Sequence, residues 1–421
     1  MAANKEEVRE ASNGASGHEA GEGVACGQAG NGGEGDLPPE TERQTVFRNI
    51  LGATVALELG QGLQRGIFNN FVVEVVGIQP SQLGLVQGIR EVPGLLTAPL
   101  AMVSGFFREN TWAGICLLLT AVGLFMHTVA LNFPMLILAT LVMSTGFHLF
   151  YPVQSSIVMK TCLPEERATK VGQMNSAGAA GSLISVAIVI AISRYWKTDY
   201  AFLHTMAAAF TALGGLAILK RAMGGKPSGR TSMDLNPRYR SYYVLTFLGG
   251  SRRHIAQTFA GYLLVEVYET PVSVMVLLSA ISSVVAIITR PLVGKVIDRW
   301  GEQKSLVMNY VLVISLFTAY GLVKVPVVLF VIFVLDHGLM GFDAAITTYL
   351  GRIAPKESLA AAYAMGSTVN HLSGVSVPVL GGFLWDAFGP GVVFASGAAI
   401  AALSLIYSRS LDRRDRALAK S

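Results

Sequence analysis

Residues 327–335 read Val-Val-Leu-Phe-Val-Ile-Phe-Val-Leu, nine apolar side chains without a polar interruption. They belong to one of about twelve apolar stretches of roughly 20 residues, each long enough to cross the hydrocarbon core of a bilayer as a helix. A membrane barrel would need shorter segments in which apolar and polar residues alternate, and residues 186–192 and 327–335 do not alternate. The sequence therefore predicts an all-α integral membrane protein.

The composition leads to the same class. Of the 421 residues, 52% are hydrophobic and 14% are charged, whereas a soluble domain carries about 25% charged residues. The expected spans begin near Phe47, Ser81, Trp112, Pro134, Thr169, Tyr200, Tyr242, Val272, Ser305, Pro326, Leu359 and Gly391.

Five segments follow from this pattern. The first 44 residues are rich in Gly and Glu and have no apolar stretch, so we expect a disordered tail there. Residues 220–240 are basic and contain Gly, Pro and Ser, which indicates a cytoplasmic linker between six spans in residues 45–219 and six in residues 241–410. Residues 411–421 form a basic tail.

The positions of the basic residues predict the topology. The formal net charge is +5, but only Arg194, Lys197 and Lys324 fall in loops on the outer side when the amino terminus is placed inside. This asymmetry fits the positive-inside rule, with both termini cytoplasmic and the protein in the cytoplasmic membrane. We therefore expect the lipid bilayer, and not a nucleic acid, to be the partner of these basic residues.

The two halves resemble each other in sequence. Several residues of the first half recur in the second at one constant offset, which indicates an internal duplication of the kind found in transporters. The pairs are Val73-Glu74-Val75 with Val265-Glu266-Val267, Thr97, Pro99 and Leu100 with Thr289, Pro291 and Leu292, and Gly146 and Phe150 with Gly338 and Phe342.

Residues 294–304, Gly-Lys-Val-Ile-Asp-Arg-Trp-Gly-Glu-Gln-Lys, resemble the signature loop of the major facilitator superfamily. In the corresponding loop of the first half, Phe106 stands where the second half has Asp298. The resemblance covers residues 45–410 and implies two pseudo-symmetric six-helix halves around a central cavity, lined by spans one, four, seven and ten. It also implies a gating loop formed by Gly294, Asp298, Arg299 and Gly301.

Polar residues gather in the spans expected to line the cavity. Ionisable side chains are costly in hydrocarbon, so in a transporter they face a cavity or a partner. In span one, Glu58, Gln61, Arg65 and Asn69 recur on one helix face. Glu58 and Arg65 lie about 10 Å apart along the axis, which predicts that each uses another partner or the solute.

The other spans add further candidates. Span seven has Arg252, Arg253, His254 and Gln257 just after Gly249-Gly250, where we expect a helix irregularity. We interpret Arg90 with Glu91 as a structural ion pair and His371 as an interior histidine. The complete set of candidate solute-binding residues is Glu58, Gln61, Arg65, Asn69, His148, Tyr151, Arg252, Arg253, Gln257 and Asn370, and that of candidate proton carriers is Asp336, Asp343 and Glu58.

These residues favour secondary transport. The sequence has no hydrolase triad or phosphate-cradling loop, so neither an enzyme nor a cofactor is expected, and energy would come from an ion gradient. Buried carboxylates carry protons and arginines bind carboxylates or phosphates, which favours proton-coupled alternating-access transport of a small anionic solute.

Three alternatives stay open. Drug export is one, although span four has no arginine and residues 172–181 lack proline. A non-transporting membrane scaffold or sensor is another. No resident metal is expected, but divalent-metal transport is the third alternative, since N, O and S ligands are available. They are His148, Asp336, His337, Met340 and Asp343.

Overall fold

The computed structural model describes residues 39–97, 107–163, 166–195, 198–219 and 236–411. Several sequence-based predictions therefore lie outside the described residues. They are the tail up to residue 38, most of the linker at 220–235, the first-half loop containing Phe106, and the basic tail after Leu411.

The described residues are helical and contain no strand. The helices of the first half are α1 Glu40–Phe71, α2 Pro80–Leu95, α4 Glu109–Met126, α5 Phe133–Thr161, α6 Arg167–Tyr195 and α7 Tyr200–Leu219. Those of the second half are α8 Arg240–Ile255, α9 Gly261–Glu266, α10 Val272–Leu322, α11 Pro326–Leu339, α12 Ala344–Ile353, α13 Lys356–Phe388 and α14 Pro390–Arg409. Proline opens α2, α11 and α14, where its missing N–H group costs nothing, and this explains why these starts were predictable.

By length and composition, seven of the described helical segments could cross a membrane. One of them, α10, contains the eighth and ninth predicted spans in a single 51-residue element. Other predicted spans do not meet this criterion of length and composition because they are short or carry polar residues. The helix α8, for example, has 16 residues before its backbone changes.

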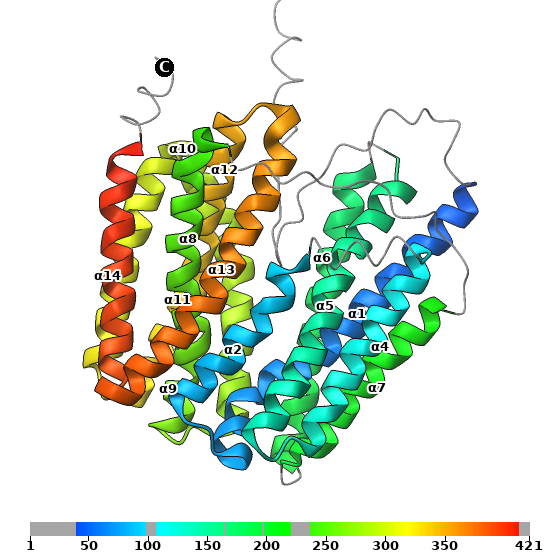
Figure 1. Cartoon of the computed structure of the whole chain (residues 1–421), viewed down its shortest axis with the longest axis horizontal. Coiled ribbons are helices and arrows are strands. Elements are labelled where there is room, and N and C mark those ends of the chain that lie inside the picture. The colour runs from blue at the N-terminus through cyan, green and yellow to red at the C-terminus, as the bar shows by residue number, and fades with distance from the viewer. Residues whose placement is uncertain (1–38, 98–106, 164–165, 196–197, 220–235, 412–421) are drawn as a thin grey trace, which may run out of the picture.

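The helices form two groups, α1–α7 and α8–α14, which converge at the end of the molecule remote from the carboxyl terminus (Figure 1). The helices α2 and α13 pack closely at the junction. A Cβ atom on Gly84 would overlap the carbonyl oxygen of Pro378, and one on Gly88 would lie 2.8 Å from the carbonyl oxygen of Val375. Glycine is thus needed for the two halves to approach along this seam.

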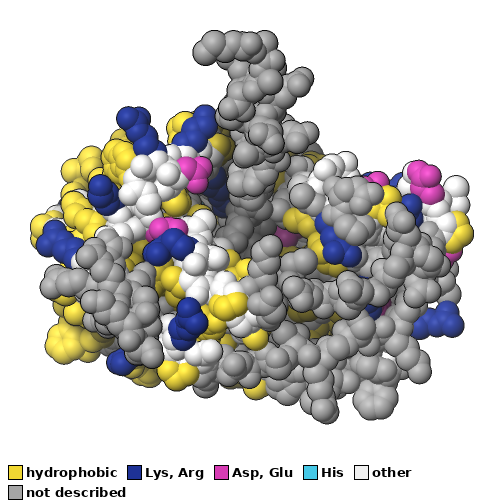
Figure 2. Space-filling view, turned by 90° about the horizontal axis from the view of Figure 1, so that it is seen from above, with side chains coloured by type: hydrophobic (Ala, Val, Ile, Leu, Met, Phe, Trp, Pro, Cys, Tyr) yellow, Lys and Arg dark blue, Asp and Glu magenta, His cyan; other side chains and the backbone are white. Residues whose placement is uncertain are grey.

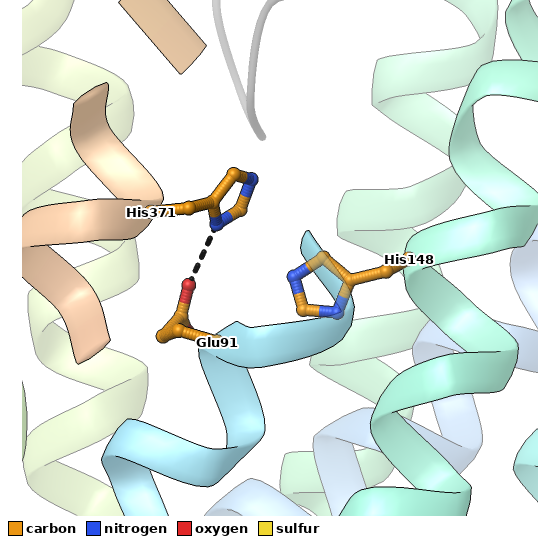
Figure 3. Close-up of side chains that lie close together, drawn as sticks. All are labelled: Glu91, His148 and His371. Atoms are coloured by element: carbon orange, nitrogen blue, oxygen red, sulfur yellow. Dashed lines mark hydrogen bonds and ion pairs between the residues drawn. The ribbon is translucent and has the colours of Figure 1, made fainter. Parts of the chain in front are cut away.

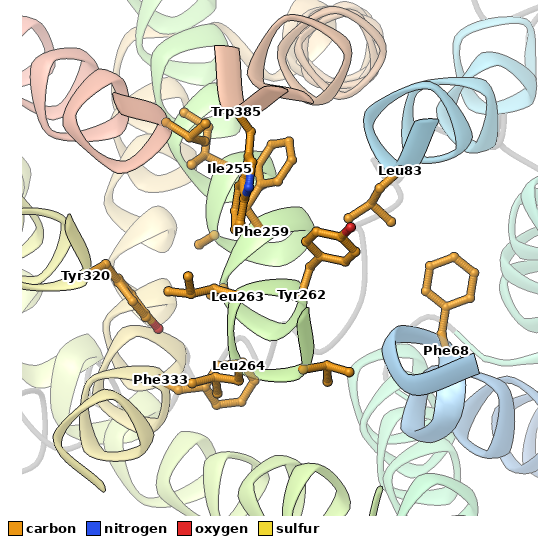
Figure 4. Close-up of a cluster of buried hydrophobic side chains, with 14 of the residues drawn as sticks. Phe68, Leu83, Ile255, Phe259, Tyr262, Leu263, Leu264, Tyr320, Phe333 and Trp385 are labelled. Carbon is orange, nitrogen blue, oxygen red and sulfur yellow. The ribbon is translucent and has the colours of Figure 1, made fainter. Parts of the chain in front are cut away.

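A buried apolar cluster joins the halves (Figure 4). Phe68 and Leu83 come from the first half, and Phe259, Tyr262 and Trp385 come from the second. The Tyr262 hydroxyl also donates a hydrogen bond of 2.9 Å to the carbonyl oxygen of Ile78. Burial of these large side chains stabilises the contact between the halves.

The first helix begins earlier than the sequence predicts. Residues 40–44, which we expected in the tail, form the first turn of α1 after Pro39. Glu40 and Glu42 lie in that turn, where acidic side chains are favoured by the helix dipole. The polar composition of this segment reflects a helix start outside the hydrocarbon.

Two helix irregularities flank the polar residues of the second half. Residues Ala256–Ala260 form a π-helical segment after α8, and Met340–Asp343 form a 3₁₀ turn between α11 and α12. The irregularity expected at Gly249-Gly250 is wrong, since both glycines are helical. A Cβ atom on Gly250 would overlap the side chain of Ser373, so this glycine allows close helix packing instead.

The face at the top of the view in Figure 1 shows scattered Lys and Arg side chains (Figure 2). Exposed arginines in the described part of the chain include Arg240, Arg352 and Arg409, at or near helix ends, and Arg299, beside the kink within α10. Their position is on the side that the positive-inside rule predicts to be cytoplasmic. The orientation itself stays a prediction.

The turn of the signature loop lies at Gly301. This residue has φ 76° and ψ 164° inside α10, whereas Gly294, the first glycine of the predicted gating loop, lies in the helix before it. Neither glycine has an atom within 4 Å of an added Cβ. The two positions therefore differ in backbone conformation and not in available space.

We expect Gly301→Ala to lower the free energy of unfolding by about 1–3 kcal/mol, because only glycine adopts this backbone conformation without strain. Gly294→Ala is the matched control and should stabilise the helix by about 0.5–1 kcal/mol. Chemical unfolding of the purified protein in detergent measures both. Equal effects of the two substitutions would contradict the requirement for glycine at position 301.

Candidate functional site

The first half presents a compact polar cluster on α1, α5 and α6. The Arg65 guanidinium donates hydrogen bonds of 2.9 Å to the Glu58 carboxylate and 3.2 Å to the Ser182 hydroxyl. The Tyr151 hydroxyl donates a hydrogen bond of 2.7 Å to the other oxygen of Glu58. The expectation that Glu58 and Arg65 are too far apart to pair is wrong, because two extended side chains span the two helical turns between them.

The residues of the predicted stripe on α1 have different environments. The Arg65 side chain is 43% exposed, while that of Glu58 is 17% exposed. Gln61 is buried, and its amide oxygen has no hydrogen-bond partner among the described residues. Asn69 is half-buried, and its amide lies beside Gly261 of the second half. Arg65 is therefore the member of this stripe that a solute reaches most easily.

The second half holds a larger charged cluster. Arg252 is fully buried and lies 3.2 Å from the Asp343 carboxylate and 4.0 Å from that of Asp336. Arg253, whose side chain is 27% exposed, lies 3.0 Å from the other Asp343 oxygen and hydrogen-bonds the Asn370 side chain. Two arginines of α8 thus meet Asp336 of α11, Asp343 of the 3₁₀ turn that follows it and Asn370 of α13.

The buried part of this cluster is incompletely satisfied. Neither carboxylate oxygen of Asp336 has a hydrogen-bond partner among the described residues, and the same holds for Nε and Nη1 of Arg252. A buried charge without hydrogen bonds is costly, so this arrangement favours any event that neutralises Asp336 or supplies a new partner. Uptake of a proton is one such event.

A third cluster lies between the two halves (Figure 3). Glu91 on α2 pairs with Nδ1 of His371 on α13 at 2.9 Å, and the His148 ring on α5 lies 5.2 Å from the His371 ring. Glu91, which we expected to pair with Arg90 beside it, thus also makes a contact across the interface. The Arg90 guanidinium lies over the Phe147 ring at 5.7 Å.

The residues that could serve divalent-metal transport do not form one group in the structure. His148 contributes to the cluster between the halves, whereas Nδ1 of His337 lies 2.8 Å from the carbonyl oxygen of Phe333. Gln257, a candidate solute-binding residue, is exposed in the π-helical segment one turn beyond Arg253.

The signature loop lies within α10, around the kink at Gly301 that separates its two spans. Asp298 and Arg299 are exposed. Glu302, next to the turn, forms an ion pair of 3.4 Å with Arg352 at the end of α12. The loop is thus tied to the tenth span, which continues from α12 back to Asp343 and Asp336.

Comparisons with known proteins identify the architecture. A model of the family described as Major Facilitator Superfamily matches residues 50–342 and, in a second match, residues 242–421. No curated protein matches the chain.

Solved structures show the same fold. The crystal structure of the nucleoside transporter NupG is 15% identical, with a TM-score of 0.73 over 89% of this chain and 99% of the other. A bacterial homologue of the human lysosomal transporter Spinster, in an inward-facing and occupied conformation, is 14% identical, with a TM-score of 0.70 over 89% and 98% of the two chains. At such identities the likeness supports the fold alone.

Proposed function

The chain belongs to the major facilitator superfamily, and on that premise we propose that it moves a small anionic solute across the cytoplasmic membrane by proton-coupled alternating access. It is a multi-pass membrane protein and a secondary transporter rather than an enzyme. The solute class, the coupling ion and the cytoplasmic position of both termini are our proposals.

The proposal is carried by Asp336, whose buried carboxylate lies 4.0 Å from Arg252 and accepts no hydrogen bond from the described residues. When both aspartates of this cluster are ionised, they balance the charges of Arg252 and Arg253. Protonation of Asp336 leaves one arginine charge uncompensated, and an anion would restore neutrality. Proton and anion thus favour each other's binding, which is the coupling that symport requires.

The accessible arginines are the candidate solute contacts. Arg65 and Arg253 are partly exposed, whereas Arg252 is fully buried and would act through the charge of the cluster. Guanidinium groups bind carboxylates and phosphates with two parallel hydrogen bonds. Tyr151, Ser182 and Asn370 supply neutral donors or acceptors for the remainder of a polar solute.

The signature loop has a separate proposed role. Glu302 and Arg352 connect it to the tenth span, so a change at Asp343 can reach the kink within α10 through α12. We propose that Asp298 and Arg299 bias the exchange between access states without contacting the solute.

Arg65→Ala is expected to weaken binding of an anionic solute at least tenfold, since it removes the most exposed cation of the first-half cluster. A screen of carboxylates, phosphates and nucleosides against the purified protein identifies the ligand, because saturation at 100 times Kd stabilises by about 2.7 kcal/mol. Titration of that ligand then gives the affinity of each variant.

Arg352→Ala is the matched control. Its side chain is 49% exposed and is also paired with a glutamate, but it lies at a helix end. It should keep the wild-type affinity. Stabilisation by nucleosides alone, or an unchanged affinity in Arg65→Ala, would contradict the anion proposal.

A further inference from the structure

We propose that Glu91, His148 and His371 form a transition-metal site between the two halves, with His254 as a fourth ligand. One donor atom of each of the first three residues lies within 4.8 Å of the others. Zinc holds nitrogen and oxygen ligands at about 2.0–2.2 Å, which puts tetrahedral ligands roughly 3.3 Å apart. Small inward side-chain rotations would close the site around an ion.

The three side chains extend from their helices toward one another (Figure 3). Both imidazoles are buried, and Oε2 of Glu91 and Nδ1 of His371 already share a hydrogen bond of 2.9 Å. A metal ion would take the place of that proton. The site is thus removed from bulk solvent. In the interior, where the dielectric constant is lower, each bond between a ligand and the ion is stronger.

His148 has a supporting residue of the kind seen at metal sites. Ser144 lies one turn earlier on α5, and its hydroxyl is 2.9 Å from Nδ1 of His148. The same hydroxyl donates to the carbonyl oxygen of Arg90, which fixes its position. Such second contacts orient a histidine so that its other nitrogen faces the ion, and here that nitrogen is Nε2.

His254 provides the independent observation. It is only 7% exposed, and its Nε2 atom has no hydrogen-bond partner within the described part of the chain. A Cβ atom on Gly374 would lie 2.8 Å from Cγ of Glu91 and 2.9 Å from Nε2 of His254. The unpartnered nitrogen and the glutamate therefore border the same small volume.

The donor set determines the class of ion. Imidazole nitrogens with one carboxylate suit zinc and its neighbours in the first transition series, whereas magnesium and calcium prefer oxygen ligands. Glu91 and His148 belong to the first half, and His254 and His371 belong to the second. A bound ion would therefore join the halves in the arrangement seen here.

The test uses the purified full chain after treatment with EDTA. Titration with zinc chloride, followed by calorimetry and by the unfolding temperature, should show binding that magnesium chloride does not reproduce. His148→Ala and His371→Ala should each weaken zinc binding at least tenfold. X-ray absorption of the zinc-loaded protein should show coordination by imidazole nitrogen.

His337→Ala is the matched control, since this histidine lies on α11 and contacts the carbonyl oxygen of Phe333. It should bind zinc like the wild type. If the alanine variants unfold at lower temperature in EDTA, Glu91→Gln, which keeps the shape of the side chain, replaces them. Unchanged zinc affinity in the ligand variants, or equal binding of magnesium, would overturn the proposal.

The outcome is separable from that of the transport proposal. Zinc titration requires no solute, and neither Asp336 nor Arg65 contributes a ligand. Asp336→Asn should therefore leave zinc affinity unchanged whatever it does to transport.

Discussion

Asp336→Asn is expected to abolish accumulation of the solute driven by a pH gradient, while exchange of solute down its own gradient continues. The carboxylate is fully buried beside Arg252, and an amide of the same shape cannot take up or release the proton. Vesicles that contain the purified protein measure both activities with the ligand found in the screen. Uphill accumulation should fall to equal concentrations on the two sides.

A control separates loss of coupling from loss of a carboxylate in general. Asp199 accepts a hydrogen bond of 3.0 Å from the backbone N–H of Phe202 at the start of α7, and an asparagine can do the same. Asp199→Asn should therefore accumulate solute like the wild type. If Asp336→Asn still concentrates solute when only a pH gradient is imposed, Asp336 is not the coupling carboxylate.

Arg252→Met is expected to lower the free energy of unfolding by about 3–5 kcal/mol, because it leaves a buried carboxylate without its cation. The effect is large because Arg252 is fully buried between Asp336 and Asp343. Chemical unfolding in a mild detergent measures it. The loss should be greatest at a pH where Asp336 is ionised in the variant.

Two further variants identify the cause. Arg253→Met should be milder, since that side chain is partly exposed and water can solvate its aspartate partner. Adding Asp336→Asn to Arg252→Met should recover most of the lost stability. An additive loss in the double variant would show that packing of the arginine, and not its charge, sustains this region.

The fold was accessible from the sequence because hydrocarbon imposes length and composition on every span. The observed starts of α2, α7 and α10 lie at or beside the predicted ones, since the apolar runs are bounded by proline, tyrosine or polar loops.

The candidate site was accessible only in part. Spacing along α1 placed Glu58 and Arg65 on one face, but it could not reveal that extended side chains would meet, or that Ser182 would join them. The pairing of Glu91 with His371 joins residues 280 positions apart, and it depends on how the halves pack. Periodicity reports which residues share a helix face, and carries no information about which faces meet.

The cluster that joins the halves in Figure 4 also has an optical consequence. Trp385 packs there against Phe259 and Tyr262, with ring centroids 5.7 and 5.5 Å away, and Tyr262 bonds to Ile78 of the opposite half. If alternating access parts the halves at this end, the indole exchanges an aromatic surrounding for water. Its emission would then shift to longer wavelength, so the chain carries its own fluorescent reporter of the access state.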